Sequence, residues 1–415
     1  MTRPTFKPYR PTLIALVNWL GRLLEKVGIR ASLDEESLLA AARRKTGLVQ
    51  FGDESFRPAL RILLQALKQE ARLHPVGRFI MRTRLVDMLG VRLGVEDMLS
   101  RHPEILQEEI RAPIVIAGLQ RTGTTMLHRL LATDPDTRAL LSWEAINPVP
   151  DPKQQSGKPD RRIKAAVLAE KALAYLSPDF FAIHPVEATA PEEDILLMDF
   201  SFMSTVAEAM VRVPTYAAWL KQQDMTPVYR YVKVLLQLLQ WQRPGKRWVL
   251  KTPAHLAHLD VVLAVFPDAK IIQTHRDPAK TAGSFSSMVA HGYGVFSDEV
   301  DTHEVAGHWH RNNADMVKAA MRVRACSPAS FLDVSYYDLL QDPMAPVRRI
   351  YEFAGLALTP QALAAMDDSR KRNVQNRHGV HHYRLEDFGL SKAQIHRDYA
   401  AYREHFQIPE EGSRA

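Results

Sequence analysis

Apolar residues recur along this chain with two different spacings. Before residue 110 they repeat every three to four residues over long stretches, which places them on one face of an amphipathic helix. Turn-forming residues such as Gly47, Pro75 and Gly90 separate these stretches. The pattern therefore predicts a helical N-terminal extension over 1–110, with helices over 32–44, 56–73 and 77–99.

From Pro113 onward, short apolar runs alternate with helix-like segments. This alternation is typical of an α/β domain built on a parallel sheet. We expect the domain to occupy 111–415 and to form a three-layer α/β/α fold of the P-loop-like type. Its strands are expected over 114–117, 248–250, 270–274 and 331–334.

A long insertion, about 151–245, separates the first two expected strands. A polar loop over 151–160 begins it, and helices are expected over 162–176, 195–210 and 227–242. Such insertions often form a lid over the sheet. Its aromatic residues suit either a hydrophobic core or a pocket for an apolar ligand. Three later helices are expected over 344–353, 360–366 and 390–406.

The first apolar run, from Thr12 to Leu20, follows Lys7 and Arg10 and is interrupted by Asn18. It is too short to span a bilayer and has no small-residue cleavage site. We expect an amphipathic helix that packs on the core, with peripheral contact with a membrane surface as the alternative. No integral membrane span is expected.

The composition narrows the function only slightly. Lys and Arg exceed Asp and Glu by 54 to 47, a net charge of +7 that suits an anionic ligand but also an ordinary solvated surface. There is no arginine-rich tract or nucleic-acid module, so no nucleic-acid partner is expected. The single cysteine, Cys326, excludes an intrachain disulfide and favours a reducing, cytoplasmic location.

The segment that follows the first expected strand has the spacing of a phosphate-binding loop. Gly118 is followed, after four residues, by Gly123 and then by Thr124 and Thr125. In such loops, backbone N–H groups and a helix N-terminus face an anion. Nucleotide hydrolases carry lysine at the position of Thr124 to reach a triphosphate. The sequence thus predicts a phosphate ligand that is not a triphosphate.

Two cationic residues lie at the carboxyl ends of other expected strands. Lys251 ends the second strand, and Arg276 ends the third. These strand ends meet at one edge of a parallel sheet, where ligands bind. Ser284 lies two helical turns beyond Arg276, and an arginine with a hydroxyl suits a monophosphate. We therefore expect two phosphate sites, one in the loop and one between Arg276 and Ser284.

Together, these motifs resemble the sulfotransferases that use 3′-phosphoadenosine 5′-phosphosulfate (PAPS). The segment 334–343 is similar to a strand and turn of that family, and 382–390 resembles the C-terminal signature of a mostly bacterial branch. The resemblance covers about 113–390. It implies transfer of a sulfuryl group from PAPS to an acceptor hydroxyl, with release of 3′-phosphoadenosine 5′-phosphate (PAP) and without a required metal ion.

The resemblance also implies roles for individual residues. The 5′-phosphosulfate would bind the loop formed by Arg121, Thr122, Gly123, Thr124 and Thr125. The 3′-phosphate would bind Arg276 and Ser284, with Arg377 in a basic stretch that closes over it, and Tyr336 would line the adenosine site. Lys251 and Arg121 would stabilise the charge that develops during transfer. A solvated basic stretch and a core tyrosine are the alternatives for Arg377 and Tyr336.

The resemblance leaves two candidates for the catalytic base. One branch places a histidine two residues after the lysine, where this chain has Pro253. Another branch places a glutamate near the position of Glu144, although the spacing from the loop is two residues longer here. Glu144 is therefore the first candidate and His255 the second. The segment Pro191-Glu192-Glu193-Asp194 has the pattern of a helix first turn. Branch members carry a similar Pro-Glu-Glu, so the resemblance offers an acceptor-side role as the alternative.

Two other functions remain as alternatives. A nucleotide kinase would need lysine at position 124 and a carboxylate for Mg²⁺. A non-catalytic protein with the same fold would have no reason to retain Lys251, Arg276 and Ser284 together. The histidines lack the spacing of a metal site, so no metal is expected. The apolar insertion favours a small-molecule or lipid-like alcohol as acceptor, and the oligomeric state is not predicted.

Overall fold

A five-stranded parallel sheet forms the centre of the protein, in a computed structural model that describes residues 6–155, 157–184, 186–372 and 383–411. The strand order is β2-β3-β1-β4-β5. The strands are β1 (Ile114–Gly118), β2 (Thr137–Ala139), β3 (Arg247–Lys251), β4 (Lys270–His275) and β5 (Phe331–Ser335). The predicted α/β fold and the four expected strands are confirmed. The short edge strand β2 was not expected.

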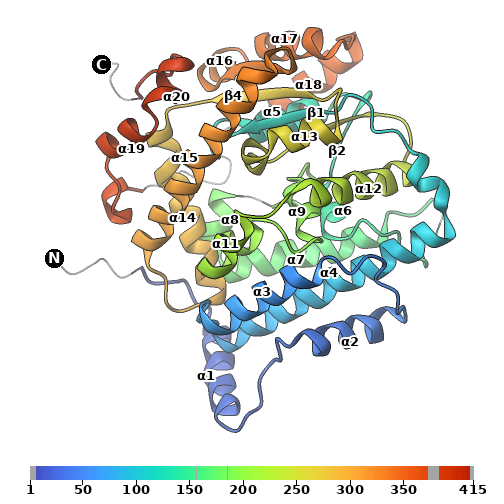
Figure 1. The fold of residues 1–415 in the computed structure, drawn as a ribbon, viewed down its shortest axis with the longest axis vertical. Coiled ribbons are helices and arrows are strands. Elements are labelled where there is room, and N and C mark those ends of the chain that lie inside the picture. Colours follow the sequence, from blue (N-terminus) through green and yellow to red (C-terminus); the bar gives the residue numbers. More distant parts are fainter. Residues whose placement is uncertain (1–5, 156, 185, 373–382, 412–415) are drawn as a thin grey trace.

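Helices cover both faces of the sheet, as expected for three layers (Figure 1). On one face, Ile114 and Ile116 of β1 pack with apolar residues of α5 (Thr124–Leu131), α17 (Met344–Ala354) and α18 (Pro360–Arg372). On the opposite face, Val115 and Ala117 belong to the larger core. Successive strand residues point to opposite faces, so an unbroken apolar run is buried on both sides.

The N-terminal region contains α1 (Thr12–Lys26), α2 (Glu35–Thr46), α3 (Arg57–Gln69) and α4 (Pro75–Arg101). Buried leucines of α2, α3 and α4 belong to the same apolar core as Val115 of β1. The boundary expected near residue 110 stays a prediction. The expectation that the first helix packs its apolar residues on the core is wrong, because Asn18 is the one buried side chain of α1.

The insertion between β2 and β3 is helical. Its helices are α6 (Ser142–Ile146), α7 (Arg161–Leu176), α8 (Pro178–Ile183), α9 (Ile195–Asp199), α10 (Val206–Met210), α11 (Pro214–Leu220) and α12 (Thr226–Gln242). The single helix expected over 195–210 is divided into α9 and α10. Phe202, between them, has a φ of +55°, which a right-handed helix does not allow.

The helices after β3 complete the two outer layers. Besides α17 and α18, they are α13 (Leu259–Val265), α14 (Pro278–Phe296), α15 (Thr302–Cys326), α16 (Tyr336–Gln341), α19 (Lys392–Asp398) and α20 (Ala400–His405). A 3₁₀ turn precedes β1 at Pro103–Gln107, and three more follow β3 at Pro253–Ala257, Pro328–Ser330 and Leu385–Phe388. The helix expected over 390–406 is two helices that meet at Tyr399. Across the described residues, we find no helix with the length and apolar character needed to cross a membrane.

Candidate active site

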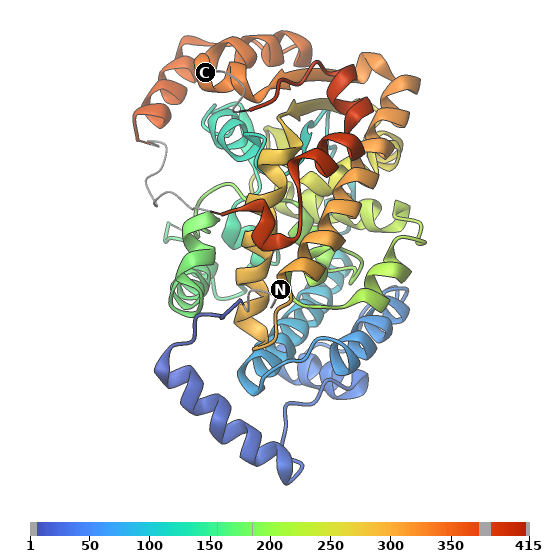
Figure 2. The same ribbon diagram turned by 90° about the vertical axis from the view of Figure 1, so that its left-hand side faces the viewer.

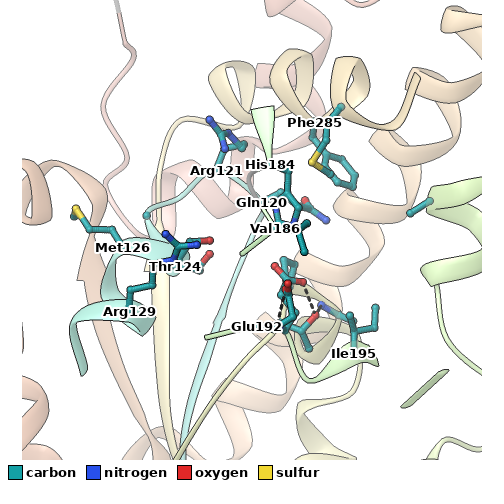
Figure 3. A pocket seen from close by; sticks show the side chains of 18 of the residues that line it. Gln120, Arg121, Thr124, Met126, Arg129, His184, Val186, Glu192, Ile195 and Phe285 are labelled. Atoms are coloured by element: carbon teal, nitrogen blue, oxygen red, sulfur yellow. Dashed lines mark hydrogen bonds between the residues drawn. The ribbon is translucent and has the colours of Figure 1, made fainter. Parts of the chain in front are cut away.

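A pocket of about 890 Å³ lies at the carboxyl edge of the sheet (Figure 3). Its polar part is formed by the loop after β1, by Thr252 after β3 and by Arg276 after β4. Its apolar part is formed by side chains of the insertion and of α14, including Phe180, Leu196, Met210, Phe285, Val295 and Phe296. The pocket therefore joins a region suited to an anion with a region suited to an apolar group.

The loop between β1 and α5 is held by contacts inside the protein. Thr122 is fully buried, and its hydroxyl donates to the Leu119 carbonyl at 2.6 Å and lies 2.7 Å from the Thr274 hydroxyl. Gly123 has a φ of +87°, and a Cβ there would lie 3.1 Å from side-chain atoms of Tyr336. Glycine therefore fits this position both in backbone conformation and in space.

The residues of the loop divide into two groups. Arg121, Gly123, Thr124 and Thr125 line the pocket, where the first turn of α5 begins. The side chain of Thr122 points into the protein instead and fastens the loop to β4. Backbone N–H groups at the start of α5 are thus presented to the pocket, as in other anion-binding helix termini.

Arg276 and Tyr336 come together at the polar end of the pocket. The guanidinium carbon of Arg276 lies 3.9 Å from the centre of the Tyr336 ring. Arg276 also donates through Nη1 to the Arg121 carbonyl at 2.9 Å, and through Nε and Nη2 to both oxygens of Glu411 at 2.7 and 3.1 Å. Arg276 is thus fixed in position, and a carboxylate already pairs with it.

Arg121 places a second guanidinium near the first. Its Nη1 donates to the Ile183 carbonyl at 3.3 Å. Desolvation in the pocket wall lowers the pKa of Arg121 from its ordinary value, and the like charge of Arg276 lowers it further. The two guanidinium groups repel each other, and an anionic ligand between them would relieve this repulsion.

Lys251 connects the loop with a carboxylate from the insertion. Its ammonium donates to Glu193 Oε1 at 2.7 Å and to the Thr125 hydroxyl at 3.4 Å. The Thr252 hydroxyl donates to the other oxygen of Glu193 at 3.3 Å. Lys251 is buried, so this ion pair is shielded from water, and such pairs are costly to break.

A sequence model that describes the sulfotransferase family matches residues 113–360, which is more than half of the chain. The chain belongs to the sulfotransferase family. This confirms the resemblance drawn from the sequence motifs at the level of the family.

Solved structures of two mycobacterial sulfotransferases are similar to this chain. STF9 from Mycobacterium avium is 29% identical, covers 92% of this chain and 99% of its own, and has a TM-score of 0.84. STF1 from Mycobacterium tuberculosis H37Rv is 33% identical, covers 89% of this chain and 98% of its own, and has a TM-score of 0.79. The sulfotransferase fold is thus confirmed over almost the whole chain.

A curated relative adds a named acceptor. The omega-hydroxy-beta-dihydromenaquinone-9 sulfotransferase Stf3 of Mycobacterium bovis is 28% identical over 257 residues, which cover 59% of this chain. The match spans 63% of the length of that protein.

Glu144 is not among the described residues that line the pocket, although Ser142 and Ile146 of the same helix are. It is buried on α6 and forms ion pairs with Arg138 at 3.0 Å and with Arg243. Its Oε2 accepts from the Leu141 N–H at 3.0 Å. The structure therefore does not bring the first-choice base together with the loop, because two arginines and a helix start hold its carboxylate elsewhere.

His255, the second candidate base, is also held in the interior. Its Nδ1 lies 2.9 Å from the Tyr229 hydroxyl, and its Nε2 lies 2.8 Å from Asp194 Oδ2. Burial by itself would raise the pKa of Asp194, but the adjacent His255 brings it below its ordinary value. His255 is absent from the described pocket lining, although its neighbour Ala254 is part of it.

Ser284 is the hydroxyl residue that the sequence pairs with Arg276. Ser284 is buried on α14, and it is not among the described residues that line the pocket. Next to it, Gly283 is covered by the Tyr383 ring, whose hydroxyl donates to the Lys280 carbonyl at 2.8 Å. Arg377 lies outside the described residues.

Over the described part of the chain, no group of three or more His, Cys, Asp or Glu side chains is placed to hold a metal ion.

Several pocket residues were not singled out from the sequence as site residues. His184, Gln120 and Arg129 line the pocket with Glu192 and Glu193 (Figure 3). Burial lowers the pKa of His184, and the carboxylates of Glu192 and Glu193 partly oppose that shift. His184 follows an aromatic segment without any recognisable motif, so only the fold brings it here.

Proposed function

We propose that this protein transfers a sulfuryl group from PAPS to the hydroxyl of a long apolar acceptor and releases PAP. The observation that carries the proposal is a single pocket with two unlike ends. One end has the loop after β1, Arg121 and Arg276, and the other has apolar side chains.

The residues of the polar end suit the donor. The loop and the start of α5 would bind the 5′-phosphosulfate, and Arg276 would bind the 3′-phosphate. Tyr336 stacks on Arg276 at the carboxyl edge of the sheet, and we propose that its ring contacts the adenosine. Glu411 accepts the same guanidinium N–H groups that a phosphate would take, so donor binding has to displace this carboxylate.

The transfer step needs a base and a cation. The acceptor oxygen attacks sulfur, and the bond between sulfur and the bridging oxygen breaks, with its electron pair passing to the phosphate of PAP. We propose that Glu193 takes the hydroxyl proton and that Lys251 stabilises the leaving oxygen. This assignment is supported by their direct contact at 2.7 Å beside Thr125.

The apolar end suits a lipid-like acceptor. Its wall contains aromatic and aliphatic side chains from α8, α9, α10 and α14, which suit a hydrocarbon body. The relative Stf3 is named for a menaquinone-type acceptor, an apolar molecule with a terminal hydroxyl. We propose an acceptor of the same physical class, an alcohol with a long hydrocarbon body.

Calorimetry with PAP tests the donor half of the proposal. The wild-type protein should bind PAP without Mg²⁺, and Arg276→Ala should lose at least tenfold in affinity. Arg84→Ala, a pocket residue that pairs with Asp199 outside the loop, serves as the matched control. Binding of ATP with Mg²⁺ in place of PAP would contradict the proposal and favour a kinase. Absence of binding to either would favour a non-catalytic protein.

A further inference from the structure

The helix α1 faces the protein with its polar side. Asn18 is buried, and its Oδ1 accepts from the Val76 N–H at 2.9 Å. Gly21 lies so close to Pro75 that a Cβ would approach the proline Cβ to 2.5 Å. Arg22, on the same side, pairs with Asp298. These contacts fix the rotation of the helix about its own axis.

The opposite side of α1 is apolar and exposed. Leu13 is 61% exposed, Trp19 56%, Leu16 52% and Leu20 46%. With 3.6 residues per turn, these side chains share one face together with Val17, Leu23 and Leu24. Figures 1 and 2 both place α1 at the edge of the molecule. An amphipathic helix that buries its polar side and exposes its apolar side requires an apolar environment outside the described chain.

The charge around this face favours an anionic lipid surface. Between Phe6 and Arg30 the sequence has five basic side chains and one acidic side chain, Glu25, and two of the basic ones, Arg10 and Arg22, share a salt bridge with Asp298. Lys26 and Arg30 are exposed at the end of the helix, and Tyr9 and Trp19 are exposed aromatics of the kind that occupy membrane interfaces. A second copy of this chain would bring two such basic segments together and repel itself.

The segment that precedes α1 contacts the helix α14, which contributes to the apolar end of the pocket. Arg10 donates to the Ser297 carbonyl at 3.2 Å, and Pro8 covers Gly294 of α14. The last turns of α14 supply Val295 and Phe296 to the pocket wall. The segment that leads into α1 is thus attached to the helix end that forms the apolar part of the pocket.

We propose that the apolar face of α1, defined by Leu13, Leu16, Val17, Trp19, Leu20, Leu23 and Leu24, binds a lipid surface that carries anionic headgroups. This places the apolar end of the pocket next to the layer from which a lipid-like alcohol would come. The link to acceptor delivery rests on the proposed function, whereas lipid binding by α1 does not.

Flotation with lipid vesicles tests the proposal without donor or acceptor. The full chain should bind vesicles of three parts phosphatidylcholine and one part phosphatidylglycerol, and less well vesicles of phosphatidylcholine alone. The double variant Leu16→Ser and Leu20→Ser should bind at least tenfold more weakly. Leu106→Ser with Leu168→Ser is the matched control, since these leucines are 51% and 69% exposed on other surfaces.

The outcomes separate the alternatives. Unchanged thermal unfolding and PAP titration of the α1 variant would show that the loss of lipid binding is not a loss of folding. Absence of vesicle binding by the wild type, or equal loss in both double variants, would overturn the proposal. A dimer that dissociates only in the α1 variant, measured by sedimentation equilibrium, would also overturn it and assign the face to a second copy. PAP binding reports separately on the proposed function.

Discussion

At the scale of single residues, the ion pair between Arg276 and Glu411 affects how an anion can bind at the polar end of the pocket. Two hydrogen bonds join the guanidinium to the carboxylate, and the Tyr337 hydroxyl lies 3.3 Å from the same carboxylate. The Glu411 N–H donates to Asp277 at 3.0 Å, which holds the backbone in place. The carboxylate therefore occupies the place on Arg276 that we assign to the 3′-phosphate.

Removing the charge of Glu411 should strengthen donor binding. In Glu411→Gln, PAP no longer competes with a carboxylate for Arg276, and we expect its affinity to rise by about threefold to tenfold, as for a partly exposed ion pair. Calorimetry measures the change. Glu410→Gln, which removes the pair with Lys392 instead, is the control. Weaker PAP binding in Glu411→Gln would mean that Glu411 positions Arg276 for the donor.

The proposed base makes a second prediction for single residues. Glu193→Gln should reduce turnover by about 10²- to 10⁴-fold, because the amide cannot take the acceptor proton. Its affinity for PAP should stay within about threefold of the wild type. Glu192→Gln, next to it in the same pocket, should retain most of the activity. If Glu193→Gln stays active and His184→Asn does not, the proton passes to His184.

The sequence indicates which of these residues lie at one edge of the sheet, but not where the others lie, for a physical reason. The loop, Arg276 and Tyr336 all follow strand ends, so a parallel sheet necessarily brings them to one edge. The surroundings of Glu144 could not be read from the sequence, because its carboxylate pairs with Arg243, almost one hundred residues away. A side chain such as His184, brought in by an insertion, has no local pattern that a sequence could reveal.

At the scale of elements, the unit formed by β1, the loop and α5 positions the polar end. His128 of α5 is fully buried, and its Nε2 lies 3.1 Å from the Val249 carbonyl of β3. This contact joins the helix that starts at the pocket to the strand that ends in Lys251. Burial and the nearby charge of Lys251 lower the pKa of His128 to about 3.

The lowered pKa makes stability depend on pH. Below pH 6.5, the ordinary pKa of histidine, the unfolded chain binds a proton at His128 that the folded protein does not bind. The free energy of unfolding should therefore fall as the pH falls, by up to about 1.4 kcal/mol per pH unit from this group, until the pH nears 3. Buried His74 and half-buried His258, whose pKa values desolvation lowers to about 4, add the same trend.

Urea unfolding at pH 7 and pH 5 measures this dependence. His128→Gln keeps a side-chain N–H for the Val249 carbonyl but cannot titrate, so its stability should fall less over this interval than that of the wild type. His405→Gln, on the exposed side of α20, should follow the wild type. Equal losses in the wild type and in His128→Gln would show that His128 becomes protonated in the folded protein.

Elements were predictable where their patterns were long. The amphipathic stretches of α2, α3 and α4 and the apolar runs of β1 and β4 were found from periodicity alone. The three residues of β2 carry too short a pattern, and it pairs with β3 only after more than a hundred residues of chain. The position of α1 was mistaken because periodicity identifies an apolar face but does not say which side of the helix meets the protein.

At the scale of the whole molecule, the pocket lies between parts that are distant in sequence. The sheet edge supplies the charged residues, the insertion supplies Glu193 and most of the apolar wall, and α14 closes the wall near α1. The N-terminal helices extend the core on one face of the sheet and support the insertion (Figure 2). This arrangement puts the proposed donor end at the sheet and the proposed acceptor end at α14, which the segment leading into α1 contacts.

Detection of a sulfate ester formed from PAPS is the most direct test of the proposed sulfuryl transfer. The protein should be incubated with PAPS in three separate reactions, one with a long-chain primary alcohol, one with a prenyl alcohol and one with a sugar. The products are then measured by mass spectrometry. We predict a sulfate ester of the long apolar alcohols with an equal amount of PAP, little product from the sugar, and loss of product in Glu193→Gln. Intact PAPS with every acceptor, or efficient sulfation of the sugar alone, would contradict the proposed function.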